Sequence, residues 1–160
     1  MCNRFVQFGK VIKPGEPAMV LMNGPGGDYE APVESIFGGP ARKESRIYWL
    51  NSLRASEVVI PGVSRFGEQH EITHQQTWEE LPPGSALRGF LLPAPPGKSY
   101  RLLKVITQPA TPDQIDRLVN DRAPVVQSFH CPPALEREIR TAFPQPPDSL
   151  PASPVQGELF

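Results

Sequence analysis

Proline constrains the folding of this chain more than any other residue type, because 21 of its 160 residues are proline. Proline fixes φ and removes a backbone donor, so it interrupts helices and central strands. Together with a modest apolar fraction of 39%, this predicts short elements joined by turns rather than long helices. The length suits one compact domain with its own core, and we expect a mixed, loop-rich α+β fold.

Short apolar runs bounded by glycine or proline are expected to form strands. They lie at 18–22, 33–37, 58–60, 87–92 and 102–107. Helices are expected at 44–54, 111–119 and 133–143 from apolar residues at helical spacing and from start signals such as Thr111-Pro112-Asp113. The domain is expected to span 1–143, followed by a proline-rich, extended or mobile tail at 144–160.

Charge and cysteine usage limit the class of protein. The net charge is −1, with 16 basic and 17 acidic residues, so no global electrostatic attraction to nucleic acid is expected. Two cysteines, no signal-peptide pattern and no apolar run near 18 residues predict a reduced, cytoplasmic protein without membrane attachment. The glycine-dense segments at 23–28 and 37–40 do not match a phosphate-binding motif. We therefore expect no cofactor, and we favour a monomer.

Cys2 directly follows Met1 and carries the most specific chemistry in the chain. Removal of Met1 leaves a free α-amine and a thiol on one residue. The amine has a reference pKa of about 7.7 to 8.0, so it is partly neutral at pH 7 and forms an imine with an aldehyde. The thiol then closes a five-membered thiazolidine. The alternative interpretation is that Cys2 is a small buried residue.

Four segments, in order along the chain, resemble motifs of the SRAP (SOS response-associated peptidase) family. They are Met1-Cys2-Asn3-Arg4, Pro40-Ala41-Arg42-Lys43-Glu44-Ser45, Val59-Ile60-Pro61 with Phe66-Gly67-Glu68, and the run Val-Asn-Asp-Arg-Ala-Pro-Val-Val at 119–126. The resemblance implies a curved, largely antiparallel, barrel-like sheet with a few short helices. It also implies a DNA-damage protein that couples covalently to abasic sites in single-stranded DNA, with autoproteolytic exposure of Cys2 or peptidase activity.

The resemblance also implies roles for individual side chains. Cys2 would be the nucleophile, Glu68 would move protons, and Asn120 would position the sugar. Three guanidiniums and one hydroxyl would bind the DNA, from Arg4, Arg42, Arg122 and Thr107. The alternative interpretation is that each arginine is a solvated surface charge and that Glu68 is a solvated carboxylate at a strand end.

The chain departs from the family pattern at the site. Asn120 stands where the family has histidine, Pro40 where it has asparagine, and Asn3 where it has glycine. An amide cannot titrate near neutral pH as imidazole does. Glu68 lies one residue farther from Pro61 than in the pattern, so we expect a bulge at Gly67 to return its side chain to the inner face. These departures keep open a degenerate binding module without covalent chemistry.

A competing motif is His70-Glu71-Ile72-Thr73-His74, which matches H-E-x-x-H. On a helix, it would place two imidazoles one turn apart for zinc, as in a metallopeptidase. The SRAP resemblance instead places this segment on a strand, and no third ligand is evident, so we expect no metal and keep the zinc peptidase as the weaker alternative. The second cysteine, Cys131, is expected to be structural.

Overall fold

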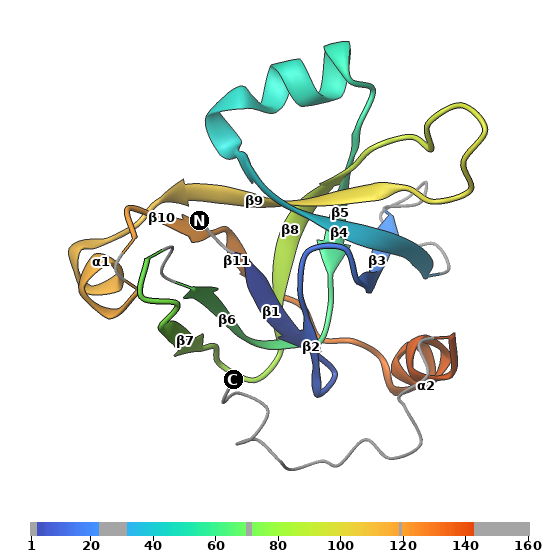
Figure 1. Cartoon of the computed structure of the whole chain (residues 1–160). Helices are drawn as coiled ribbons and strands as arrows, with labels where there is room; N and C mark the ends of the chain where they lie inside the picture. The colour runs from blue at the N-terminus through green and yellow to red at the C-terminus, as the bar shows by residue number, and fades with distance from the viewer. Residues whose placement is uncertain (1–2, 23–31, 70–71, 119, 143–160) are drawn as a thin grey trace.

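The computed structural model describes residues 3–22, 32–69, 72–118 and 120–142. Strands predominate and helices are few, which confirms a mixed α+β chain (Figure 1). The elements are β1 (Arg4–Gln7), β2 (Lys10–Ile12), β3 (Pro17–Met22), β4 (Val33–Arg42), a 3-10 turn (Lys43–Ser45), a π-helical turn (Tyr48–Ser52), β5 (Ser56–Ile60), β6 (Val63–Gln69), β7 (Gln76–Glu80), β8 (Ser85–Leu91), β9 (Leu102–Pro109), α1 (Pro112–Leu118), β10 (Arg122–Pro124), β11 (Val126–Ser128) and α2 (Pro133–Ala142).

The strands form two sheets. The smaller sheet is antiparallel, with the order β2-β1-β6-β7. The larger sheet has the order β10-β9-β4-β3-β5-β8-β11 and is mixed, because β4 and β9 are parallel. Since β8 pairs with β9 as well as with β5, the strands β9, β4, β3, β5 and β8 close into a ring. The SRAP-like architecture stays a prediction.

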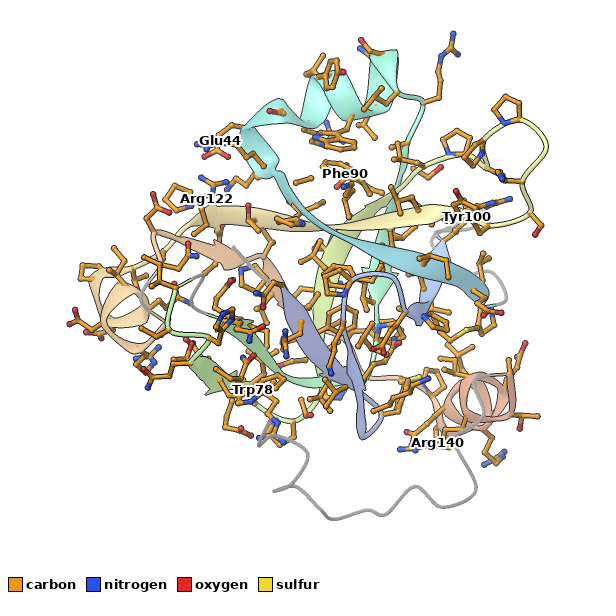
Figure 2. The ribbon with its side chains drawn as sticks, in the orientation of Figure 1. Glu44, Trp78, Phe90, Tyr100, Arg122 and Arg140 are labelled. Carbon is orange, nitrogen blue, oxygen red and sulfur yellow. The ribbon has the colours of Figure 1, made fainter. Side chains whose placement is uncertain are left out.

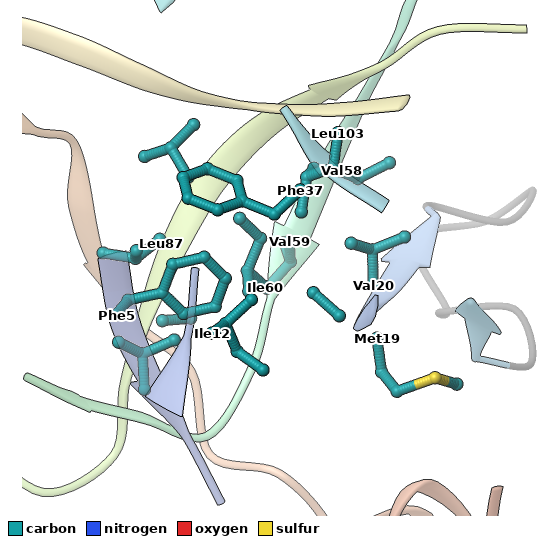
Figure 3. Packing of buried hydrophobic residues seen from close by; sticks show 14 of the residues in the cluster. Phe5, Ile12, Met19, Val20, Phe37, Val58, Val59, Ile60, Leu87 and Leu103 are labelled. Atoms are coloured by element: carbon teal, nitrogen blue, oxygen red, sulfur yellow. The ribbon is translucent and has the colours of Figure 1, made fainter. Parts of the chain in front are cut away.

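Apolar side chains from both sheets share one core (Figure 3). Phe5 of β1 and Phe66 of β6 are fully buried in the same cluster as Phe37 of β4. The rings of Phe5 and Phe37 meet edge to face, with centroids 5.1 Å apart. Such aromatic contacts favour one relative orientation of the two rings, in addition to the free energy gained by burying apolar area. The smaller sheet therefore packs one face against the ring of strands.

Gln7, at the end of β1, is a fully buried polar residue whose amide joins three parts of the chain. Its Nε2 donates to the carbonyl oxygens of Met19 at 2.8 Å and Pro61 at 3.0 Å, and its Oε1 accepts from the Met19 N–H at 3.0 Å. A buried amide without these partners would be costly. The three bonds hold β1 against β3 and against the residues just before β6.

The expected helix at 44–54 is a 3-10 turn followed by a π-helical turn. Of the apolar residues at helical spacing that were expected to face the core, Ile47, Leu50 and Leu53, the prediction is wrong for Ile47, which is 65% exposed. Leu50 contacts a second apolar cluster together with Trp49, whose ring stacks on Phe90 with centroids 5.7 Å apart. The wider turn changes which residues face the sheet, as shown by the Leu53 N–H donating to the Tyr48 carbonyl.

The two α-helices were predicted at their observed places. At α1, the Thr111 hydroxyl accepts from the Gln114 N–H at 3.3 Å, and the Gln114 amide oxygen accepts from the Thr111 N–H at 3.0 Å. This reciprocal pair is a capping box, which fixes the helix start. α2 buries Ile139 against the core. The expected tail at 144–160 lies outside the described residues, and in the part that is described no helix has the length and apolar character needed to cross a membrane.

All five expected strands are present, as β3, β4, β5, β8 and β9. β4 extends beyond the expected range through the Gly38-Gly39-Pro40 segment, where its register with β9 shifts. Gly39 has φ +96°, which favours glycine, and a Cβ on Gly38 would lie 2.6 Å from Leu102 Cδ1. Proline is tolerated at such an irregularity because the ladder is already interrupted. The two glycines thus allow β4 to continue through the irregularity as far as Arg42.

We predict that the Phe5–Phe37 contact couples the smaller sheet to the ring. In a double-mutant cycle with Phe5→Leu and Phe37→Leu, the free energies of unfolding from urea denaturation should show a coupling of about 1 kcal/mol. Pairing Phe5→Leu with Trp49→Leu, in the other cluster, is the control and should be additive. Equal coupling in both cycles would contradict this packing.

Candidate active site at the start of β1

Strand pairing brings the start of the chain beside Glu68. β1 and β6 are antiparallel, with Arg4 opposite Gly67, and the Asn3 N–H donates to the Gly67 carbonyl at 3.3 Å. Asn3 is therefore held beside Gly67, the residue that precedes Glu68. Cys2 lies outside the described residues, but its Cα is covalently limited to about 3.8 Å from that of Asn3. The predicted nucleophile is therefore tethered to the strand that borders Glu68.

Glu68 lies on the buried side of β6, as expected, although the irregularity that directs it there is not at Gly67. The β1–β6 register skips Ser64, between Val63 and Arg65, whereas Gly67 pairs regularly on both sides. Skipping Ser64 allows both Val63 and Phe66 to be buried, and Glu68 shares the face of Phe66 by strand alternation. The expected bulge at Gly67 is thus wrong in position.

Gly67 has a different role, which is close packing. A Cβ at this position would lie 2.4 Å from Gln76 Nε2, 2.4 Å from the Thr77 carbonyl oxygen and 2.9 Å from Trp78 Cε3. Because the Thr77 oxygen belongs to the backbone, it cannot move aside without disturbing the β6–β7 ladder. Gly67 therefore lets β7 approach the residue that precedes Glu68.

Glu68 is 6% exposed, and burial raises its pKa from 4.5 to about 7, with the Arg4 guanidinium acting in the opposite direction. Burial disfavours the charged form of a carboxyl group. A group whose pKa lies near the ambient pH both gives and takes a proton readily. Glu68 therefore has the protonation behaviour of a general acid and base.

Polar side chains lie on both faces of the smaller sheet near this end of β6. Arg4 Nη2 donates to Gln69 Oε1 at 2.9 Å, and burial lowers the pKa of Arg4. Three further polar atoms are buried and have no hydrogen-bond partner among the described residues: Asn3 Oδ1, Gln76 Oε1 and Trp78 Nε1. Buried polar atoms of this kind are costly unless a ligand or water pairs with them. Gln76 and Trp78 pair with Gln69 and Gly67, so they project from the face of the smaller sheet opposite to Glu68.

Trp78 lies on the face of the smaller sheet opposite to Glu68. It lies opposite Gly67 in the β6–β7 register, and the Arg65 guanidinium stands over its ring at 4.9 Å from the centroid. Figure 2 labels Trp78 on β7, at the opposite end of the view from Glu44 and Phe90. A guanidinium over an indole is a favourable arrangement that also holds the ring in place.

Arg122 and Thr107 are engaged in a structural network. Arg122 donates from Nη1 and Nη2 to the two carboxylate oxygens of Glu44, at 3.0 and 2.7 Å, and from Nη2 to the Thr107 carbonyl at 2.8 Å (Figure 2). The Thr107 hydroxyl donates to the Ala41 carbonyl at 3.1 Å. Arg122 holds the pKa of Glu44 at about 2. DNA binding by Arg122 and Thr107 stays a prediction, and this geometry favours a role in joining β4, β9 and β10.

Asn120 and Arg42 differ in how available their side chains are. Asn120 Oδ1 accepts from the Arg122 N–H at 2.9 Å, so this amide stabilises the turn between α1 and β10. Arg42 ends β4 and is exposed, and its guanidinium makes no hydrogen bond or ion pair within the described part of the chain. Sugar positioning by Asn120 stays a prediction. Arg42 is therefore a more accessible cation for a phosphate than Arg122.

The described half of the H-E-x-x-H motif is neither helix nor strand. His70 and Glu71 lie outside the described residues, while Ile72 and Thr73 form a turn and His74 has φ +59°. The strand expected here is therefore wrong for 72–74, and the helix needed for a zinc site is absent there. No group of three or more His, Cys, Asp or Glu side chains suited to a metal is present among the residues that the structure describes.

Cys131 is half-buried and packs against the main core just before α2, as expected of a structural residue. Burial raises the pKa of its thiol. A thiol with a raised pKa is a poor nucleophile at neutral pH. This leaves Cys2 as the cysteine with the more favourable chemistry for covalent capture.

Several residues of the site were not anticipated. Gln76 is brought beside Gly67 only through the β6–β7 pairing, and Glu44 enters as the partner of Arg122. Glu44 belongs to the 40–45 motif, and its charge, which is complementary to that of Arg122, was the available signal. For Gln76, the sequence carried no such signal, whereas Trp78 is one of four aromatic residues, with Phe37, Tyr48 and Trp49, that the sequence offered for stacking on bases.

No protein-family model, no curated protein and no solved structure matches this chain.

We predict different consequences for two arginines. Arg122→Gln removes the charge-assisted bonds to Glu44 and should lower the free energy of unfolding by about 2 kcal/mol. Arg42→Gln, with the same change of charge at an exposed site, should change it by less than about 0.5 kcal/mol. Urea denaturation measures both. Equal losses would contradict the structural assignment of Arg122.

We predict a pH dependence of stability from Glu68. Its pKa is about 7 in the folded chain and near 4.5 in the unfolded chain. The folded chain therefore retains a proton that the unfolded chain releases, so the contribution is full below pH 4.5 and is lost as pH rises to about 7. The loss should be on the order of 3 kcal/mol.

Urea denaturation between pH 4.5 and 7.5 tests this dependence. Glu68→Gln should flatten the slope in that window, because it removes the titrating group. Glu44, whose pKa is about 2, acts below the window and leaves the comparison undisturbed. A slope that persists unchanged in Glu68→Gln would show that another group is responsible.

Proposed function

We propose that this protein captures the aldehyde of an abasic site in single-stranded DNA as a thiazolidine on Cys2. The observation that carries the proposal is the position of Glu68. It is a buried carboxyl with a pKa of about 7, on the strand paired with the residue that follows Cys2. The resemblance to the SRAP family supports the choice of an abasic site over other aldehydes.

The chemistry requires a free α-amine, so Met1 must be removed first, by the autoproteolysis that the resemblance implies or by ordinary processing. The amine of Cys2 then attacks the C1′ aldehyde, and a C–N bond forms in a carbinolamine. Loss of water gives an imine. The sulfur attacks the imine carbon to form the C–S bond, and the ring nitrogen takes up a proton. The net reaction joins aldehyde and aminothiol with release of one water and no change of oxidation state.

Glu68 would serve the two proton transfers of this sequence. In its protonated form, the carboxyl donates to the hydroxyl group that leaves the carbinolamine as water. The resulting carboxylate accepts the proton of the Cys2 thiol and makes the sulfur nucleophilic. A pKa of about 7 keeps both forms populated at neutral pH.

Contacts to DNA would be few and local. The net charge of −1 offers no broad attraction to a polyanion. Arg4, whose charge acts on Glu68, would hold a phosphate next to the reacting sugar, and Arg42, exposed at the end of β4 near Glu44, would hold another phosphate of the strand. Asn3 would present its amide oxygen to a hydroxyl group of the sugar.

A second candidate function is noncovalent DNA binding by a degenerate member of the same family. The observation that favours it is the hydrogen bond between Asn120 Oδ1 and the Arg122 N–H, because this amide replaces the family's histidine and is occupied within its own turn. In this case, Cys2 would retain Met1 or react only slowly.

We expect that the chain lacking Met1, verified by intact mass, forms a gel-shifted adduct with abasic single-stranded DNA that survives denaturation. Cys2→Ala should abolish the adduct, and Cys131→Ala, the matched control, should leave it unchanged. Glu68→Gln should slow adduct formation about a hundredfold, as expected from the loss of a general acid and base.

Noncovalent DNA binding without an adduct would support the second candidate. An adduct that persists in Cys2→Ala would contradict the proposed chemistry, and an unchanged rate in Glu68→Gln would contradict the proposed role of the carboxyl. Comparing Cys2→Ala with Glu68→Gln thus distinguishes the role of the nucleophile from that of the group that transfers protons.

A further inference from the structure

A pocket of about 240 Å³ lies on the large sheet beneath the 43–46 segment. Its base is apolar, from Phe90, Ile106 and Val125. Its remaining lining consists of charged side chains, from Lys43, Arg46, Glu57 and Arg88. None of these residues belongs to the site around Glu68, so the pocket does not depend on the proposed function.

Three cations and one carboxylate line the pocket, which gives a formal charge of +2. Arg46 Nε donates to Glu57 Oε1 at 2.6 Å, and Arg88 Nη2 donates to Glu57 Oε2 at 3.1 Å. Burial raises the pKa of Glu57, but the hydrogen bonds from the two arginines outweigh it, so the pKa lies below its ordinary value. Glu57 is therefore an anion that orients both guanidiniums.

Each guanidinium retains donors for a ligand. Arg has five N–H donors, and in the described part of the chain Arg46 uses Nε and Arg88 uses Nη2. Among the described residues, the Lys43 ammonium has a single hydrogen bond, of 3.4 Å, to Gln108 Oε1. Guanidiniums in a fixed orientation, together with an ammonium, suit the several oxygens of a phosphate.

We propose that this pocket binds the phosphate group of a phosphate ester. Arg46, Arg88 and Lys43 surround the phosphate oxygens, and the alcohol portion of the ester lies on the apolar base. The volume accommodates a phosphate and the first atoms of its ester rather than a large cofactor. The ester is either a free nucleotide or one linkage of a nucleic acid strand, since both present the same group.

The test uses the full chain at constant ionic strength, with the backbone amide signals of Arg88 and Val125 followed by NMR. The probes are inorganic phosphate, thymidine 5′-monophosphate and an undamaged oligothymidine, which has no aldehyde and cannot react with Cys2. Arg88→Gln should weaken phosphate binding about tenfold, as expected for the loss of one charge-assisted bond. Arg137→Gln, an exposed arginine on α2, is the matched control and should have no effect.

Lys43→Gln is the second variant, because Lys43 is exposed and its loss should not impair folding. It should weaken phosphate binding several-fold. Weaker oligothymidine binding in the same variants would identify the source as a strand, and weaker binding of the monophosphate alone would identify a free nucleotide. Amide signals that do not move with phosphate, or equal losses in Arg137→Gln, would overturn the proposal.

Discussion

The buried amide of Gln7 is the interaction on which the geometry of the candidate site depends. It makes three hydrogen bonds at the end of β1, while the Phe5 ring packs edge to face on Phe37. Because both contacts fix β1 against the ring of strands, the register with β6 is set and the Asn3 N–H bonds to Gly67, the residue before Glu68. A small polar sheet would otherwise have little apolar area to define its position.

Two glutamates illustrate how the fold assigns different chemistry to the same side chain. Glu44 is held as a carboxylate by Arg122, with a pKa of about 2, and its role is to join elements. Glu68 is buried, and its pKa is about 7. Environments that separate the pKa values of like groups are typical of acid and base sites. Glu44 is therefore a charged structural group, whereas Glu68 is a carboxyl that titrates near neutral pH.

The sequence predicted the strands of the ring because these are short apolar runs between glycine and proline, and it predicted α1 from the Thr111 cap. It did not predict β1, β2 or β7, since these strands are short and carry polar residues such as Arg4, Gln7 and Gln76. Their pairing depends on contacts distant in sequence. The inward direction of Glu68 was predicted, but the irregularity at Ser64 follows from packing on both sides of β6.

The central claim is that the start of β1 delivers Cys2 to the carboxyl of Glu68. The most direct measurement is a set of nuclear Overhauser effects on the chain lacking Met1, with the side chains of both residues assigned. This account predicts cross-peaks between the β-protons of Cys2 and the γ-protons of Glu68. Cross-peaks from Cys2 to other parts of the molecule, with none to Glu68 or its strand neighbours, would contradict it.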